Sequence, residues 1–164
     1  MMAKSHVVVG VAAWIAAAPL LHLSPVNPIY LALTTAGSLL PDIDHPNSWV
    51  GRRSRPISTA IAAALGHRGF THSAVAVAGL VALLSHAGYR QGAVSALAVG
   101  YLSHLAADML TPRGLRLAWP LRGSWGLPLC RTGSPMETII VIALAFEIAW
   151  RFLPHDTNKI ATLL

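Results

Sequence analysis

Five apolar stretches, separated by short segments that contain proline or glycine, constrain the fold of this chain more than any other feature. They cover about residues 6–23, 28–40, 73–88, 92–110 and 138–153. A membrane-spanning helix needs ~20 predominantly apolar residues, so several of these stretches are short for a span. Pro25 and Pro28 separate the first two, and Gly88 and Gly92 separate the third from the fourth, which indicates hairpins of helices.

The composition agrees with a membrane protein. Hydrophobic residues make up 54% of the chain and charged residues only 11%, whereas an average soluble domain carries about 25% charged residues. We therefore predict an all-α fold, a polytopic membrane bundle of four to five helices in which residues 1–164 form a single domain. A sixth stretch, residues 57–65, is too short to span and follows three arginines, which predicts an interfacial helix.

The distribution of lysine and arginine predicts the orientation. If the N-terminus is cytoplasmic, only Arg90, Arg151 and Lys159 lie outside, which leaves nine of the 12 basic residues inside. This predicts a multi-pass protein of the inner (cytoplasmic) membrane with a cytoplasmic N-terminus. The first stretch also loosely resembles a secretory signal, but the apolar pattern continues along the chain and favours a retained helix.

Charge and cysteine content narrow the partners and the metal chemistry. The net charge of +6 indicates membrane lipid with anionic head groups as a partner, because the basic residues form no basic helix of the kind that binds nucleic acid. No nucleic acid is expected. Cys130 is the only cysteine, which excludes an intrachain disulfide and a thiolate-rich zinc site. Any metal would be bound through nitrogen and oxygen.

The segment between Pro41 and Pro46 carries two carboxylates and an imidazole directly after an apolar stretch: Asp42, Asp44 and His45. Ionisable groups at membrane depth cost a few kcal/mol each, so they usually pair, face water or bind an ion. The flanking prolines restrict the backbone, which favours a turn that can hold ligands in place. By itself, the segment could equally be a polar interfacial loop in which Asp42 caps a helix.

A second motif, residues 66–73, brings His67 and His72 to the start of the third long stretch, with Arg68 between them. The Arg68 guanidinium could bind a phosphate oxygen, because its donors form a planar fork. In the alternative interpretation, Arg68 anchors the cytoplasmic side and the histidines are interfacial, with Thr71 or Ser73 capping the helix.

A third motif places His104 and Asp108 four residues apart, and therefore on one face of a helix. One ion could contact both side chains, although an internal hydrogen bond between helices is an alternative. Glu137 opens the last helix, either as a further ligand or as an acid that the helix dipole favours.

The predicted topology brings these candidates to one side. Nine residues map to the cytoplasmic ends of their helices: His6, Asp42, Asp44, His45, His67, His72, His104, Asp108 and Glu137. His22, His86 and His155 map to the opposite side and are expected to be structural or exposed. So many ligands exceed the needs of one zinc, so we expect one to three divalent ions, Zn²⁺ or Mn²⁺. All nine except His45 are candidate metal ligands. Paired ions suit phosphoester cleavage.

The order of these motifs resembles that of the YdjM-like inner-membrane proteins, described as predicted metal-dependent hydrolases. The resemblance covers His6, residues 39–46, 66–73, 100–114 and 133–137, and Trp119-Pro120. It implies a metal-dependent hydrolase of the inner membrane. More distantly, the order is similar to that of the helical zinc phospholipase C and nuclease P1 type enzymes. That similarity implies a set of ligands: His6, Asp42 or Asp44, His72, His104, Asp108 and Glu137. The final His-x-x-x-Glu pair of those enzymes is absent here.

We therefore expect a membrane-bound, metal-dependent hydrolase that cleaves a phosphoester, with lipid head groups among the candidate substrates. Asp44 or His45 would act as general base or acid, and Arg68 would offset charge in the transition state. A metalloprotease is disfavoured because the sequence lacks His-Glu-x-x-His. The alternative outside enzymology is a metal-ion transporter or metal-sensing regulator, which should place some carboxylates at mid-membrane.

Overall fold

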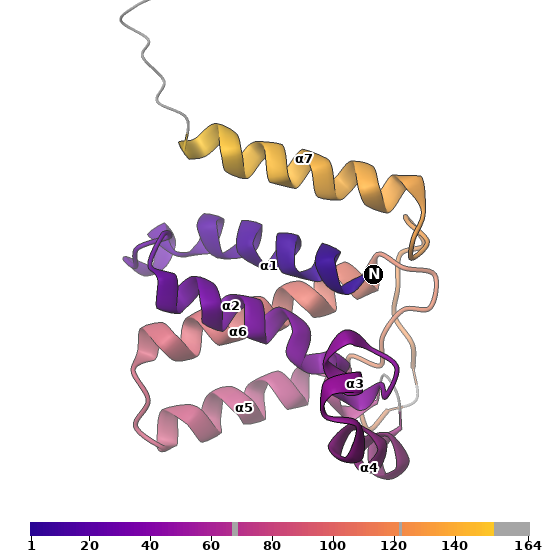
Figure 1. Ribbon diagram of the computed structural model, residues 1–164. Coiled ribbons are helices and arrows are strands. Elements are labelled where there is room, and N and C mark those ends of the chain that lie inside the picture. The colour runs from indigo at the N-terminus through magenta and orange to yellow at the C-terminus, as the bar shows by residue number, and fades with distance from the viewer. Residues whose placement is uncertain (67–68, 122, 153–164) are drawn as a thin grey trace, which may run out of the picture.

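The computed structural model describes residues 1–66, 69–121 and 123–152, and every regular element in these ranges is a helix. The long helices are α1 (Ala3–Ala17), α2 (Pro28–Leu39), α5 (Ala74–His86), α6 (Gln91–Met109) and α7 (Pro135–Phe152). They run roughly side by side (Figure 1). The all-helical prediction is confirmed, and each predicted stretch overlaps one of these helices.

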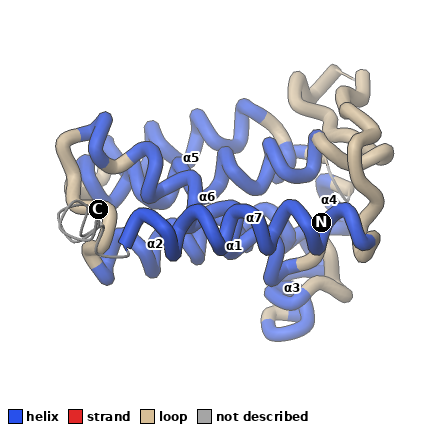
Figure 2. The backbone as a smooth tube through the Cα atoms, turned by 90° about the horizontal axis from the view of Figure 1, so that it is seen from above, coloured by secondary structure: helices blue, strands red, loops and turns tan. Residues whose placement is uncertain are grey.

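Short helical elements connect the long ones. They are α3 (Trp49–Arg53), α4 (Arg55–Leu65) and the 3₁₀ turns η1 (Pro19–Leu21), η2 (Leu40–Asp44) and η3 (Phe70–His72). Helices α3 and α4 lie at the end of the bundle where the chain starts, as the two perpendicular views show (Figures 1 and 2). The predicted short helix at 57–65 is α4, while its position at a membrane interface stays a prediction.

Polar caps begin several helices where the sequence places them. Asn27 Oδ1 accepts hydrogen bonds from the backbone N–H groups of Ile29 and Tyr30 at the start of α2, and Pro28 occupies the first turn, where its missing N–H is tolerated. Ser73 Oγ accepts from Ala76 N at 3.2 Å and so begins α5. Ser73, one of the two capping candidates in the alternative interpretation of this motif, thus fixes the helix start immediately after His72.

Helices α1, α2 and α6 pack closely because glycines allow their backbones to approach. A Cβ atom at Gly37 would lie 2.2 Å from Leu97 O, and one at Gly100 would lie 2.1 Å from Thr34 O. On α1, a Cβ atom at Gly10 would lie 2.8 Å from the Ser38 Cβ. These three helices form the centre of the bundle, with α5 packed on α6 and α7 packed on α1.

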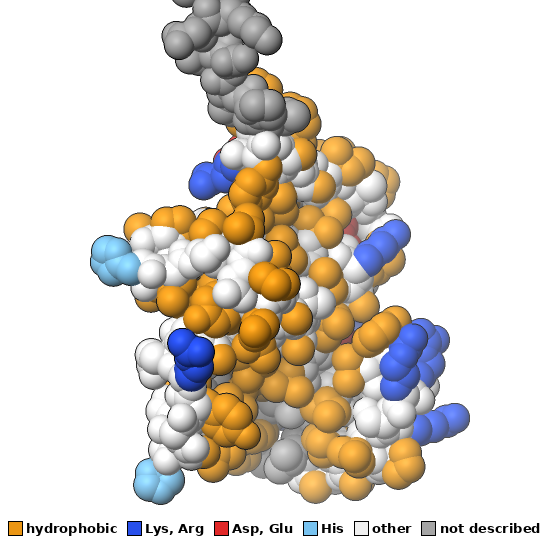
Figure 3. Space-filling model, turned by 60° about the vertical axis from the view of Figure 1, so that its left-hand side comes forward, with side chains coloured by type: hydrophobic (Ala, Val, Ile, Leu, Met, Phe, Trp, Pro, Cys, Tyr) orange, Lys and Arg blue, Asp and Glu red, His pale blue; other side chains and the backbone are white. Residues whose placement is uncertain are grey.

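The outer faces of the bundle are largely apolar. Figure 3 shows hydrophobic side chains spread over the visible face, and large apolar residues of α5 and α7 such as Leu83, Ile142 and Phe146 are exposed. Within residues 1–66, 69–121 and 123–152, none of the helices has both the length and the apolar character needed to cross a membrane. The predicted multi-pass arrangement therefore stays a prediction.

Candidate metal centre

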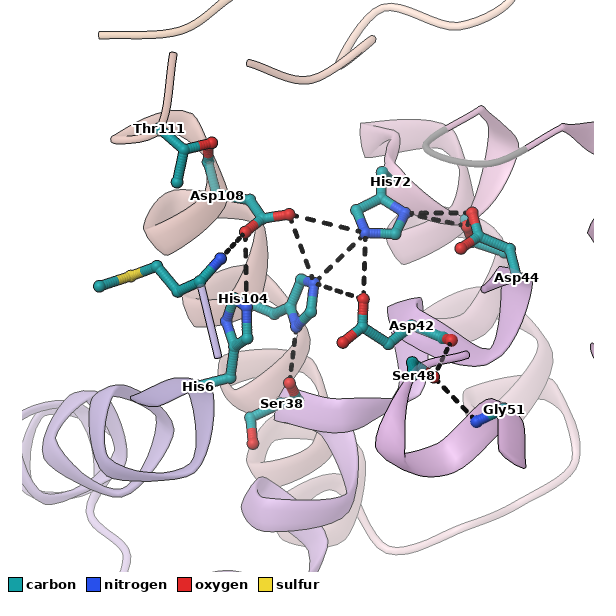
Figure 4. A network of polar contacts seen from close by, with 12 residues as sticks. His6, Ser38, Asp42, Asp44, Ser48, Gly51, His72, His104, Asp108 and Thr111 are labelled. Carbon is teal, nitrogen blue, oxygen red and sulfur yellow. Dashed lines mark hydrogen bonds and ion pairs between the residues drawn. The ribbon is translucent and has the colours of Figure 1, made fainter. Parts of the chain in front are cut away.

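Five side chains from four elements converge at the end of the bundle where the chain starts: His6 of α1, Asp42 of η2, His72 of η3, and His104 and Asp108 of α6 (Figure 4). Four of them are almost completely buried, whereas the Asp42 side chain is 21% exposed. Segments that are far apart in the sequence thus place imidazole and carboxylate groups together, with Asp42 on the accessible side.

The ligand atoms of Asp42, His72 and His104 lie close enough to hold one metal ion, and Asp108 lies near both histidines. The Nε2 atoms of the two histidines are 3.3 Å apart. Asp42 Oδ1 lies 3.9 Å from His72 Nε2 and 3.8 Å from His104 Nε2, and Asp108 Oδ2 lies 3.9 Å from each of these nitrogens. Two atoms that are each about 2.0 to 2.2 Å from a tetrahedral ion lie roughly 3.3 to 3.6 Å apart. These residues therefore fit a divalent ion with only small adjustments.

Hydrogen bonds fix which nitrogen of each histidine faces the site. His104 Nδ1 lies 2.7 Å from the carbonyl oxygen of Ser38, which can only accept, so the proton is on Nδ1. His72 Nδ1 lies 3.3 Å from the Asp44 carboxylate, which likewise favours a proton on Nδ1. Both Nε2 atoms then present lone pairs to each other. This arrangement is repulsive unless a cation or a shared proton lies between them.

Asp44 supports His72 from behind. Its carboxylate accepts a short hydrogen bond from the Thr71 hydroxyl, and Tyr101 donates to the Thr71 backbone carbonyl at 2.5 Å. Asp44 is fully buried and belongs to neither group of side chains that could share an ion. The sequence predicts Asp44 as a ligand and as an acid or base, whereas in the structure Asp44 lies behind His72 and positions its ring. Metal-binding histidines commonly have such a partner on the other ring nitrogen.

His6 and Asp108 extend the cluster on the opposite side of His104. The His6 ring stacks on His104 with centroids 3.8 Å apart, and His6 Nε2 lies 3.4 Å from Asp108 Oδ1. The Met1 ammonium also contacts this oxygen, at 2.6 Å. His6 Nδ1 is buried and has no hydrogen-bond partner in the described part of the chain. Two groups could hold an ion, and both include His104: His6 with Asp108, and Asp42 with His72.

The other predicted site residues have different positions. Glu137 is buried, but its two oxygens accept from the backbone N–H groups of Met2 and Gly133, each at 2.7 Å, so it ties the chain start to α7 instead of joining the ligand groups. His67 and Arg68 lie outside the described residues, as does His155. His22 and His86 are exposed, as expected, and lie at the other end of the bundle, where His22 follows η1 and His86 ends α5.

A cavity of about 590 Å³ lies beside the cluster. Asp42 and His45 line it on one side, Trp49 lines it from α3, and Arg113 and Arg131 line it from the segments after α6 and before α7. His45, predicted as acid or base, thus faces a space that a substrate could enter. In the sequence, Arg113 and Arg131 served only to predict the orientation of the chain in the membrane. The sequence signal that could have placed both arginines near the site is that Arg113 follows Asp108 closely and Arg131 precedes Glu137 closely.

Comparison with known proteins gives consistent matches. A family model described as YdjM inner membrane protein matches residues 1–164. "Inner membrane protein YdjM" of Escherichia coli (strain K12) and of Shigella flexneri are each 44% identical over 126 residues, which cover 72% of this chain and 63% of theirs. The match thus spans less than two thirds of those relatives. "Uncharacterized protein YvsG" of Bacillus subtilis (strain 168) is 31% identical over 153 residues, covering 93% of this chain and 94% of its own. No solved structure matches.

Proposed function

The chain belongs to the YdjM family of inner membrane proteins, and we propose that it is a metal-dependent hydrolase that cleaves a phosphoester at the cluster of histidines and aspartates. Family membership supports an inner-membrane location. One observation carries the proposal: two buried Nε2 lone pairs face each other at 3.3 Å between two carboxylates. The cavity beside Asp42 gives such a centre access to a substrate.

The donor set favours a divalent ion such as zinc or manganese, since imidazole and carboxylate groups bind both. Asp42, His72 and His104 would hold one ion, and His6, His104 and Asp108 form an alternative position for it, because His104 has only one free ring nitrogen. When bound, a divalent ion supplies Lewis acidity and activates water for attack.

The residues of this chain would have separate tasks in the reaction. Asp44 keeps the proton of His72 on Nδ1, so that Nε2 stays available as a ligand. His45 lines the cavity and would carry a proton to or from the reacting group, as a general acid or base. His6, His72, His104 and Asp108 are buried away from water, so that the accessible side of the cluster is the one at Asp42.

A metal-ion transporter or metal-sensing regulator would use the same ligands but needs a path along the helices. Among the described acids, Asp42, Asp44, Asp108 and Glu137 lie at the site end, and Glu147 pairs with Arg151 at 2.7 Å. No described carboxylate therefore lies at the centre of the bundle, which favours a catalytic site over a pathway.

Turnover by the purified full chain tests the function. Metal-stripped protein in detergent should hydrolyse bis-p-nitrophenyl phosphate or p-nitrophenyl phosphate only after zinc or manganese is added, and His104→Ala should remain inactive. His22→Ala should match the wild type, because His22 lies at the far end of the bundle. The hydrolase proposal fails if the metal-loaded wild type hydrolyses these esters no faster than His104→Ala does. If proteoliposomes that contain the protein then take up the ion, the protein is a metal-ion transporter instead.

We also propose that the long helices cross the membrane and that the site end faces the cytoplasm. The arginines of α3 and of the cavity lie at this end, whereas Arg90 precedes α6 at the other. An end rich in arginine is typical of the cytoplasmic side of a membrane protein, and an end with few arginines is typical of the outer side. Reporters fused after Arg55 should be active in the cytoplasm, and reporters fused after Gly88 should be active in the periplasm. The reverse pattern would contradict the proposed topology.

A further inference from the structure

We propose that the cavity beside the metal centre binds a phosphoryl group and that Arg113 and Arg131 are the residues that hold it. The proposal rests on the proposed function for its substrate class, because it adds the part of the site that recognises the phosphoester. The binding step itself can be measured without turnover, so the two proposals can fail separately.

The size and position of the cavity suit a ligand. Its volume of about 590 Å³ lies within the ~300 to 1,000 Å³ of ordinary small-molecule sites. Asp42, the partly exposed donor of the metal cluster, lines it together with His45. A group bound in this cavity would therefore lie next to the accessible side of the metal centre.

Hydrogen bonds to the end of α6 hold the backbone near both arginines. Thr111 Oγ1 donates to the Asp108 carbonyl at 2.7 Å, and Gly114 N donates to Thr111 O at 3.0 Å, which encloses Arg113 in a turn. Cys130, the buried neighbour of Arg131, donates from its backbone to Leu110 O at 3.0 Å. Both side chains thus start from ordered segments beside Asp108, which lowers the entropic cost of binding a ligand between them.

The two guanidinium groups have charge available for a ligand. Both residues are exposed, and neither forms an ion pair with a carboxylate within residues 1–66, 69–121 and 123–152. Arg151, in contrast, pairs with Glu147, and Arg53 stacks on Trp49 at 3.6 Å. Among the described residues, the contacts of the carboxylates at this end include histidines, backbone groups, the Thr71 hydroxyl and the Met1 ammonium.

A phosphoryl group matches this arrangement better than a neutral ligand. The planar fork of arginine forms paired hydrogen bonds with phosphate oxygens, and the tetrahedral group has enough oxygens for two guanidinium groups and a metal ion at once. The same chemistry is present in a lipid head group and in a soluble phosphoester. The phosphoryl group is therefore the recognised unit, and its source is a separate question for experiment.

Titration of the metal-loaded full chain with inorganic phosphate tests the proposal. Arg113→Gln and Arg131→Gln should each weaken phosphate binding about 10-fold or more, because each removes a charged hydrogen-bonding group. The double variant should lose measurable binding, while its metal content equals that of the wild type. Arg90→Gln is the matched control, since it removes an exposed arginine at the other end of the bundle, and it should bind as the wild type does. A double variant that binds phosphate as tightly as Arg90→Gln overturns the proposal.

A second arm identifies the source of the phosphoryl group. The affinities of the wild type and of the arginine variants are measured for three ligands: short-chain phosphatidate, the diacylglycerol that lacks its phosphate, and p-nitrophenyl phosphate. Weaker binding of phosphatidate alone in the arginine variants assigns the cavity to lipid head groups, and weaker binding of the soluble ester alone assigns it to soluble substrates. Equal affinity for phosphatidate and diacylglycerol, unchanged in the variants, counts against the proposal. If both arginines bind phosphate but the protein hydrolyses no phosphoester, the hydrolase proposal fails and the phosphoryl-binding site stands. If the protein hydrolyses a phosphoester and the arginine variants have an unchanged KM, the phosphoryl-binding site fails and the hydrolase proposal stands.

Discussion

Replacing His104 with alanine is expected to remove bound metal from the protein, because His104 belongs to both groups of side chains that could hold an ion. His72→Ala should have a comparable effect on the ion held with Asp42. Loss of a direct ligand removes one metal bond and leaves buried carboxylates without a compensating charge. Metal stoichiometry, measured on monodisperse protein in detergent by elemental analysis, checks this result.

Matched histidine variants control for a general folding defect. His22→Ala and His86→Ala remove exposed imidazoles at the other end of the bundle and should retain full metal content. Asp44→Asn should weaken metal affinity about 10 to 100-fold without abolishing it, as is usual for a residue that orients a ligand. Equal metal content in all four alanine variants would contradict the site, and equal loss in all four would indicate a structural role.

The Gly100→Ala substitution is expected to be the most destabilising single methyl addition in the centre of the bundle. The new Cβ would lie 2.1 Å from Thr34 O and 2.9 Å from Ser38 N, both backbone atoms that cannot rotate away. Overpacking of this kind costs about 3 kcal/mol when the backbone must move. Separation of α2 from α6 would also move Ser38 O away from His104 Nδ1, so metal affinity should fall. The free energy of unfolding in mixed detergent micelles, followed by circular dichroism, measures the loss.

Gly79→Ala provides the control for the added methyl group. Gly79 lies within α5, and its Cβ would meet no atom within 4 Å. Alanine is a better helix former than glycine by up to ~1 kcal/mol, so this variant should be unchanged or slightly more stable. If both glycine variants unfold with the same free energy, close packing of α2 on α6 does not support the bundle.

Local sequence signals predicted the helices and much of the candidate site. Prolines, glycines and capping residues act over a few positions, so Pro25 and Pro28 indicated the break before α2, and Ser73 was one of two candidates for the start of α5. The four-residue spacing of His104 and Asp108 places both on one helix face without any tertiary information. The scarcity of carboxylates in an apolar chain indicated that Asp42 and Asp108 have a special environment.

Tertiary structure alone decided how the candidates divide their roles. Asp42 and Asp44 are two residues apart on η2, and the tight 3₁₀ turn directs one toward the cavity and the other behind His72. The sequence predicts both as metal ligands and Asp44 also as an acid or base, because two carboxylates on the same segment cannot be told apart by their local pattern. Likewise, an acid at the start of a helix, such as Glu137, could be a metal ligand or a residue that the helix dipole favours. Only the structure shows that its oxygens accept hydrogen bonds from the backbone N–H groups of Met2 and Gly133.

The remaining features depend on contacts between distant segments, which leave no pattern in a single sequence. Ser38 contributes a backbone carbonyl to His104, 66 residues away, and any residue type could supply that atom. The approach of α2 to α6 through Gly37 and Gly100 brings that carbonyl within reach. Arg113 and Arg131 face one cavity because two loops both bind the end of α6. The sequence therefore determined which chemical groups lie at one end of the bundle, and packing of the helices decided which of them face each other.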